Sequence, residues 1–176
     1  MKFIVASLLF LLAVGILERP VGLQAQEPLD GPTRIFKDDL LDNLVGNWKL
    51  KREIQGRTAE NSVTVAWVLN HQFLQIHMKD VKKPATYEAM VFVGYDNTSE
   101  RYVVHWLDVF GGRFSETLGY GKRSGNSIKF VFEYPDGPFH NTFIWTPETK
   151  GWRFLMEQKN KNGTWGVFAQ DTLTNP

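Results

Sequence analysis

Turn-forming residues separate short apolar runs along most of this chain, and this pattern restricts the possible folds more than any other feature. Residues 87–95 and 101–110 are rich in β-branched and aromatic side chains, while the segment between them contains Asp96, Asn97 and Ser99. These polar residues accept turn conformations that branched side chains resist, so the stretch predicts a β-hairpin. The pattern recurs and predicts ten strands, at residues 47–54, 61–69, 73–80, 87–95, 101–110, 113–122, 127–134, 139–146, 152–159 and 165–173.

Short connections between consecutive strands predict an antiparallel meander. An open sheet of this width would leave two unpaired edges and one long apolar face, whereas closure removes the edges. We therefore expect an all-β fold, a ten-stranded antiparallel up-and-down barrel, with a two-sheet sandwich as the alternative. With 176 residues, 43% of them hydrophobic, the chain has material for one such domain.

One amphipathic helix is expected before the strands, at residues 35–45. Leu40, Leu41 and Leu44 recur at helical spacing between acidic residues, and Gly46 is placed to end the helix. The expected organisation is a signal peptide (1–25), a leader (26–34), this helix (35–45) and a barrel domain (46–174).

The first residues predict export. Lys2 precedes an apolar run at residues 3–17 and the small residue Ala25, which is the order of a cleaved secretory signal; a retained membrane anchor is the alternative. The chain has no cysteine, so we expect a bacterial periplasmic or secreted protein with no stable membrane span after cleavage. Its net charge of +1 and scattered basic residues give no footprint for nucleic acid.

Alternation of side chains along the strands assigns an inner face and with it a candidate site. Residues 113–122, for example, are expected to point Phe114, Glu116, Leu118 and Tyr120 inward. A carboxylate–guanidinium pair made by Arg52 with Asp108 or Glu116 could hold the polar end of a ligand. The alternative is that these inner polar groups only satisfy one another. The expected ligand-binding residues are Trp48, Arg52, Trp67, Tyr102, Trp106, Asp108, Glu116, Tyr120 and Phe132.

No motif in the sequence assigns a catalytic residue, a metal ligand or a cofactor. The chain shows no nucleophile elbow, phosphate loop or zincin helix, although paired carboxylates in a cleft would leave no linear signature. His71, His77 and His105 could share a metal or haem site, but their spacing favours unrelated histidines.

Two stretches carry a family resemblance. The sequence Leu44-Val-Gly46-Asn-Trp48 resembles the Gly-x-Trp start of lipocalin-like barrels. A second set resembles a family of bacterial, mostly exported proteins known only as a domain of unknown function with a calycin-type barrel: Gly94-Tyr95-Asp96-Asn97, Tyr102, Trp106-Leu107-Asp108, Gly119 and Gly121. The resemblance covers residues 40–174 and implies a barrel, export and binding of a small, largely apolar molecule. This sequence lacks the Thr-Asp-Tyr turn of true lipocalins. It also lacks the C-terminal histidine of nitrobindin-like haem barrels.

The leading functional hypothesis is therefore non-enzymatic binding of a small apolar or amphipathic ligand inside the barrel. The alternatives are a hydrolase-like or isomerase-like enzyme that uses inner carboxylates, and a non-catalytic envelope interaction protein. A homodimer is also expected, unless the helix at 35–45 covers the apolar outer side of the hairpin. That side consists of Met90, Phe92, Val103, His105, Leu107 and Val109.

Overall fold

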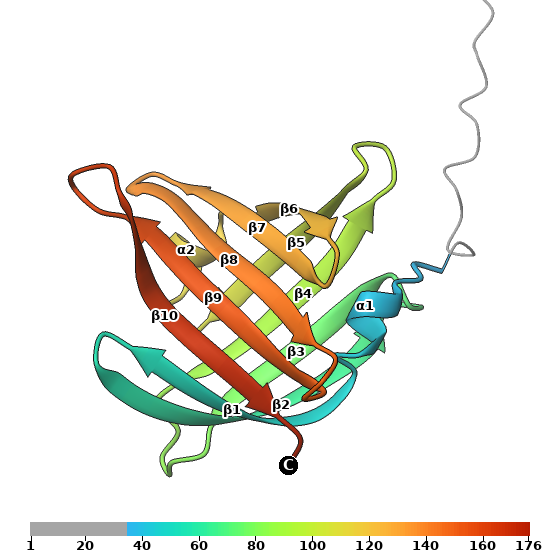
Figure 1. The fold of residues 1–176 in the computed structure, drawn as a ribbon, viewed down its shortest axis with the longest axis horizontal. Helices are drawn as coiled ribbons and strands as arrows, with labels where there is room; N and C mark the ends of the chain where they lie inside the picture. The colour runs from blue at the N-terminus through green and yellow to red at the C-terminus, as the bar shows by residue number, and fades with distance from the viewer. Residues whose placement is uncertain (1–34) are drawn as a thin grey trace, which may run out of the picture. The chain divides into compact units, whose positions relative to one another are not determined.

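Ten antiparallel strands make up most of the computed structural model, which describes residues 35–176 (Figure 1). The strands are β1 (Gly46–Ile54), β2 (Arg57–Val68), β3 (Phe73–Asp80), β4 (Glu88–Asp96), β5 (Arg101–Asp108), β6 (Gly119–Ser124), β7 (Ser127–Tyr134), β8 (Gly137–Thr146), β9 (Gly151–Lys159) and β10 (Trp165–Thr174). Each strand pairs with its neighbours in sequence and β1 also pairs with β10, so the sheet is a closed barrel. The all-β ten-stranded barrel is confirmed. The predicted signal peptide and leader lie outside the described residues.

The pairing of β1 with β10 closes the barrel. Its register places Leu50 opposite Leu173 and Arg52 opposite Asp171. Every second residue of β1 is buried, so that Trp48, Leu50 and Arg52 face the interior. Closure satisfies the backbone groups of both end strands, which would otherwise form exposed edges.

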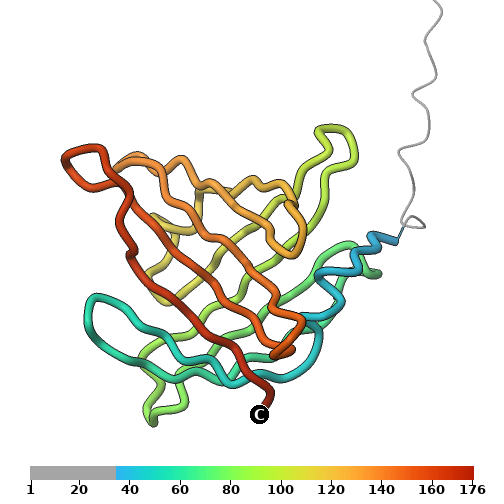
Figure 2. Tube along the Cα trace, in the orientation of Figure 1, coloured from blue at the N-terminus to red at the C-terminus, as the bar shows by residue number. Residues whose placement is uncertain are grey.

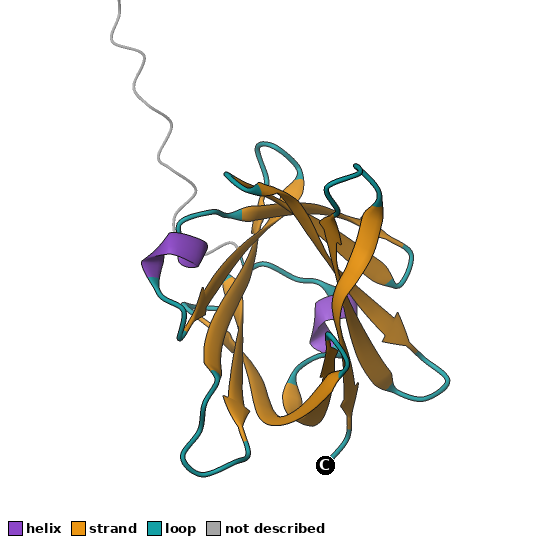
Figure 3. Ribbon diagram, turned by 90° about the vertical axis from the view of Figure 1, so that its left-hand side faces the viewer, coloured by secondary structure: helices purple, strands orange, loops and turns teal. Residues whose placement is uncertain are grey.

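The antiparallel order gives the barrel two different ends. Residues 35–45 lie before β1, and we call them the plug segment and their end of the barrel the plug end; the tube in Figure 2 shows them in blue beside the barrel. The connections β1–β2, β3–β4, β5–β6, β7–β8 and β9–β10 lie at the opposite end, which we call the cavity end. The two short helices occupy separate places on the barrel (Figure 3).

The helix in the plug segment is much shorter than predicted. α1 spans Asp39–Asp42, and the Asp38 side chain caps it by accepting hydrogen bonds from the backbone N–H groups of Leu40 and Leu41. The helical spacing of the leucines predicts a buried face, and this is confirmed, since Leu40, Leu41 and Leu44 are at most 2% exposed. One turn is enough to bury that face against the barrel, and so short a helix is stable only because it is docked.

Three tryptophan side chains from the barrel hold the plug segment. Their indole N–H groups donate to the plug at distances of 2.7 to 3.2 Å: Trp48 to the carbonyl of Leu44, Trp152 to the carbonyl of Asn43, and Trp67 to the carboxylate of Asp42. The first two carbonyls follow the helix, where backbone acceptors lack partners within it. The plug end is thus closed by apolar packing and by matched hydrogen bonds.

The predicted strand at residues 113–122 is wrong in its first half. Residues Gly112–Ser115 form a second short helix, α2, and β6 begins at Gly119. The predicted inner face is also wrong, because Gly119 and Gly121 are buried while Tyr120 is exposed. The reason is lack of space: a Cβ atom on Gly119 would lie 2.6 Å from both Phe132 and Val104.

Candidate ligand-binding site

The cavity end of the barrel contains a cavity of about 640 Å³. Its lining comes from the strands β1, β5, β7, β8, β9 and β10, from α2 and from the connections near them. The side chains on it are those of Arg52, Ile54, Tyr87, Trp106, Asp108, Phe110, Arg113, Phe114, Glu116, Phe132, Tyr134, Phe139, Asn141, Met156, Gln158, Lys159 and Phe168, together with residues 135–138. Its volume lies within the range of about 300–1,000 Å³ that is usual for small-molecule sites.

Aromatic rings form much of the cavity wall. Phe132 and Tyr134 are alternate residues of β7 and stack with ring centroids 5.6 Å apart, and Phe139 of β8 meets Phe168 edge to face at 5.5 Å. Phe168 reaches the cavity because the β9–β10 register shifts between Val167 and Ala169, which breaks the simple alternation of β10. Burial raises the pKa of Tyr134, so its hydroxyl stays protonated at neutral pH.

An ion pair is buried among the cavity-lining strands. Arg52 of β1 donates from Nε to Oδ1 of Asp171 at 2.7 Å and from Nη2 to Oδ2 at 2.6 Å, and the two residues are 9% and 0% exposed. Burial disfavours the charged guanidinium, but the paired carboxylate outweighs this effect and holds the pKa of Arg52 above its ordinary value. Burial raises the pKa of Asp171, and the hydrogen bonds and charge of Arg52 oppose this effect. The two hydrogen bonds from the guanidinium favour the charged carboxylate, so the pair is neutral as a unit.

Tyr87 connects this pair to the aromatic wall. The guanidinium carbon of Arg52 lies 5.0 Å from the centre of the Tyr87 ring, and the indole N–H of Trp106 donates to the Tyr87 hydroxyl at 3.3 Å. Burial raises the pKa of Tyr87, so it also remains neutral. The four side chains form one network along the inner side of β1, β5 and β10 and the chain just before β4.

Asn141 of β8 is the one cavity-lining residue whose side chain has a buried oxygen without a partner among the described residues. It is 2% exposed, and its Oδ1 accepts no hydrogen bond. Its partners across the sheet are Phe130 and Met156, whose side chains offer no N–H or O–H group. A buried acceptor without a donor is uncommon and unfavourable in folded proteins.

The mouth of the cavity carries charged and exposed apolar side chains on the β5–β6 connection. Phe110 and Phe114 are 68% and 46% exposed. Asp108 accepts a hydrogen bond from the backbone N–H of Phe110 at 3.0 Å, and Arg113 lies 3.5 Å from Asp136 across the opening. The charged side chains of Arg113 and Asp136 at the mouth are therefore exposed to water. Arg52, deeper in the barrel, is buried and paired with Asp171.

The structure brings five of the nine sequence-predicted site residues to this cavity: Arg52, Trp106, Asp108, Glu116 and Phe132. The expected partner of Arg52 is corrected, because its guanidinium pairs with Asp171 and neither Asp108 nor Glu116 forms that pair. Sequence reasoning missed Tyr87, Asn141 and Asp171. An inward-facing signal was available for Asp171, since it alternates with the apolar residues Ala169 and Leu173 on the last strand.

The other four predicted residues lie away from the cavity. Trp48 and Trp67 hold the plug segment, and Tyr102 donates its hydroxyl to Asp38 at the plug end. Tyr120 lies on the outer surface, with the Arg101 guanidinium 3.8 Å above its ring. These aromatic side chains have structural partners already.

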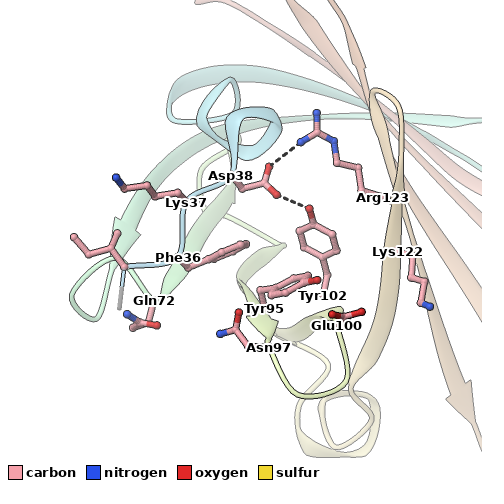
Figure 4. Close-up of a pocket in the computed structure, with 11 residues that line it drawn as sticks. Phe36, Lys37, Asp38, Gln72, Tyr95, Asn97, Glu100, Tyr102, Lys122 and Arg123 are labelled. Carbon is pink, nitrogen blue, oxygen red and sulfur yellow. Dashed lines mark hydrogen bonds and ion pairs between the residues drawn. The ribbon is translucent and has the colours of Figure 1, made fainter. Parts of the chain in front are cut away.

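A second, shallower cleft of about 530 Å³ lies where the plug segment meets the ends of β5 and β6 (Figure 4). In Figure 4 Asp38 lies between Tyr102 and Arg123, with the rings of Phe36 and Tyr95 beside them. Burial and the hydrogen bond to Asp38 raise the pKa of Tyr102. Asp38 binds both Tyr102 and Arg123, so the cleft is a joint between the plug segment and the barrel.

The histidines are distributed over separate contacts. His71 stacks on Trp67 at 4.2 Å, His77 bonds to Glu88, His105 to the carbonyl of Ser115, and His140 stacks on Trp165. Within residues 35–176 no group of three or more His, Cys, Asp or Glu side chains is arranged to hold a metal ion. No helix in that part of the chain is long and apolar enough to cross a membrane.

Comparison with known proteins places the whole barrel in one family. A family model described as a protein of unknown function matches residues 37–173, from the plug segment to the last strand. No curated protein matches the chain.

Proposed function

The chain belongs to the DUF1579 family of proteins of unknown function, and we propose that it binds a small apolar or amphipathic molecule in the cavity end of its barrel. The observation that carries the proposal is the cavity itself, about 640 Å³ in volume and walled by aromatic side chains. The resemblance to lipocalin-like barrels supports it by analogy alone.

Physical chemistry favours an apolar occupant. Side chains such as Trp106, Phe139 and Phe168 face the cavity at the end of a barrel whose remaining interior is packed. Water against such walls makes few hydrogen bonds, and a ligand that displaces it gains free energy in proportion to the apolar area removed from water. Because the wall is formed by paired strands, the site needs little reorganisation before it binds.

The enzyme alternative rests on Asp108 and Glu116, which both line the mouth. Asp108 is engaged by the backbone of the following turn, where it accepts the N–H of Phe110. This contact gives the carboxylate a structural role that needs no substrate. Replacement of Glu116 by Gln would leave binding intact under our proposal, whereas an acid–base role would require the carboxyl group.

A fluorescent probe of apolar sites, N-phenyl-1-naphthylamine, tests the proposal. We expect a saturable rise in fluorescence with one probe bound per chain. Gln158 lies on the cavity wall and is exposed, so Gln158→Trp fills space without disturbing the core and should weaken binding by roughly tenfold or more. Thr172→Trp places the same side chain on the outer surface of β10 and should leave binding unchanged. A wild-type protein that does not bind the probe, or equal binding by the two variants, would reject the proposal.

Export and self-association are further parts of the proposal. The sequence of residues 1–25 supports export to the periplasm or the exterior, which N-terminal sequencing of the mature protein would test. On the outer side of the β4–β5 hairpin Met90 and Val109 are 40% and 54% exposed, and the plug segment is held elsewhere, at the plug end. We infer that a second copy covers this surface; a monomer mass at all concentrations in sedimentation would refute it.

A further inference from the structure

The polar groups at the depth of the cavity define what kind of ligand head would be bound there. Arg52 supplies a cation, but Asp171 matches it with two hydrogen bonds of 2.6 and 2.7 Å. Among the described residues that line the cavity, the other cations are Arg113, which faces Asp136 at the mouth, and the exposed Lys159. A carboxylate or phosphate carried to the depth of the cavity would therefore meet no unmatched positive charge and would lie near Asp171.

An anionic head group could therefore be bound only at the mouth of the cavity. A head group there would remain in water beside side chains such as Arg113, which is 75% exposed. Ion pairs in such surroundings contribute little to affinity. Charge thus gives the site no strong preference for fatty acids or other amphipathic anions.

Asn141 favours a ligand that carries an uncharged hydrogen-bond donor. Its Oδ1 is buried and without a hydrogen-bond donor, while the residue borders the cavity. This oxygen has almost no exposed surface, so a ligand reaches it only when the Asn141 amide turns toward the cavity. An O–H or N–H group of the ligand would then satisfy it, and the apolar remainder of the ligand would lie along the rings of Phe132 and Phe139. The donor must be uncharged, because an ammonium group would have to be buried without a partner carboxylate.

We propose that the cavity is selective for neutral amphipathic molecules with a hydrogen-bond donor at one end, a hydroxyl or an amide N–H, and that Asn141 accepts this hydrogen bond. The inference rests on the proposed ligand-binding function and adds the class and orientation of the ligand. The polar end lies at depth, against β8, and the apolar chain runs toward Phe110 and Phe114 at the mouth.

Three ligands that share a ten-carbon chain test this selectivity by displacement of N-phenyl-1-naphthylamine at neutral pH. They are 1-decanol, its methyl ether, which has no donor, and decanoate, which is charged. We expect decanol to bind about tenfold more tightly than either of the others, which is the effect of one well-placed hydrogen bond. Because this comparison changes the ligand and leaves the protein intact, it does not depend on any variant folding.

The protein side is tested with Asn141→Leu, which has nearly the same shape and no acceptor. The variant should keep its affinity for the ether, which has no donor, while the advantage of decanol disappears. Its thermal midpoint should be equal to or above that of the wild type, since the replaced amide oxygen had no partner. A lower midpoint would show that the Asn141 amide stabilises the fold, which would contradict the inference that its oxygen is free to accept a hydrogen bond from a ligand.

The outcomes separate this inference from the function on which it rests. If the probe binds but decanoate or the ether matches decanol, or if Asn141→Leu preserves the preference for decanol, the inference is wrong and the binding function stands. If the wild-type protein binds none of the four compounds, both are rejected.

Discussion

Arg52 and Asp171 face each other at the seam where the first and last strands of the barrel pair. A bidentate pair at this position fixes the register of β1 against β10, because a shift of either strand by one residue would turn its own member of the pair to the outside. Their carboxylate and guanidinium are also among the most buried charges of the described chain. The pair is thus part of the scaffold as much as of the cavity.

Removal of one charge of this pair should be far more damaging than removal of both. Asp171→Asn leaves the guanidinium buried without a counter-charge and should lower the free energy of unfolding by about 3–5 kcal/mol. The double variant Arg52→Met with Asp171→Leu should return it to the wild-type value or above, as often occurs when a buried ion pair is replaced by apolar side chains. Urea denaturation measures both. A single variant as stable as the wild type would mean that the pair is solvated.

At the scale of secondary-structure elements, the plug segment shows how a very short helix is held in place. The carboxylate of Asp38 accepts the N–H groups of Leu40 and Leu41 and the hydroxyl of Tyr102. These contacts join the start of α1 to β5. The three tryptophan N–H groups hold its other side, so the plug is an integral part of the barrel.

We expect Asp38→Ala to lower the free energy of unfolding by about 2 kcal/mol, since it removes a helix cap and leaves the buried Tyr102 hydroxyl without its acceptor. Asp39→Ala is the matched control. Asp39 is exposed and pairs with Arg123 at the surface, so its loss should have a much smaller effect. Equal effects of the two substitutions in thermal or urea unfolding would contradict the role assigned to the cap.

The sequence predicted most elements because turn residues and alternating apolar residues coincide in them, as at the β4–β5 hairpin. It failed at residues 113–118, where apolar Phe114 and Leu118 alternate with polar residues but belong to a helix and a connection. These residues lie at the mouth of the cavity, where the chain is not a regular strand, so the alternation of apolar and polar residues there does not indicate a strand. The sequence also does not predict that Phe168 faces the cavity. A β-bulge between Val167 and Ala169 changes which face of the strand a residue lies on, and no sequence pattern indicates that bulge.

For the whole molecule, closure of the barrel determines which residues meet. Arg52 and Asp171 are 119 positions apart, and only the pairing of β1 with β10 brings them together. The sequence identified Arg52, Trp106 and Asp108 as inward-facing because alternation is local. It could not distinguish the plug end from the cavity end, so residues such as Trp48 and Tyr102 were grouped with them.

The two ends of the barrel also give the most direct test of ligand binding in the cavity. The chain has six tryptophans, and each indole N–H gives its own signal in a ¹H–¹⁵N correlation spectrum. Trp106 lies on the cavity wall, whereas Trp48 and Trp152 donate to the plug segment at the other end. Single Trp→Phe variants assign the signals.

Titration of the labelled protein with N-phenyl-1-naphthylamine should shift the indole signal of Trp106 to saturation and leave those of Trp48 and Trp152 in place. Shifts confined to Trp48 and Trp152, or a spectrum unchanged at saturating probe, would contradict the account that the cavity end of this barrel is a ligand-binding site.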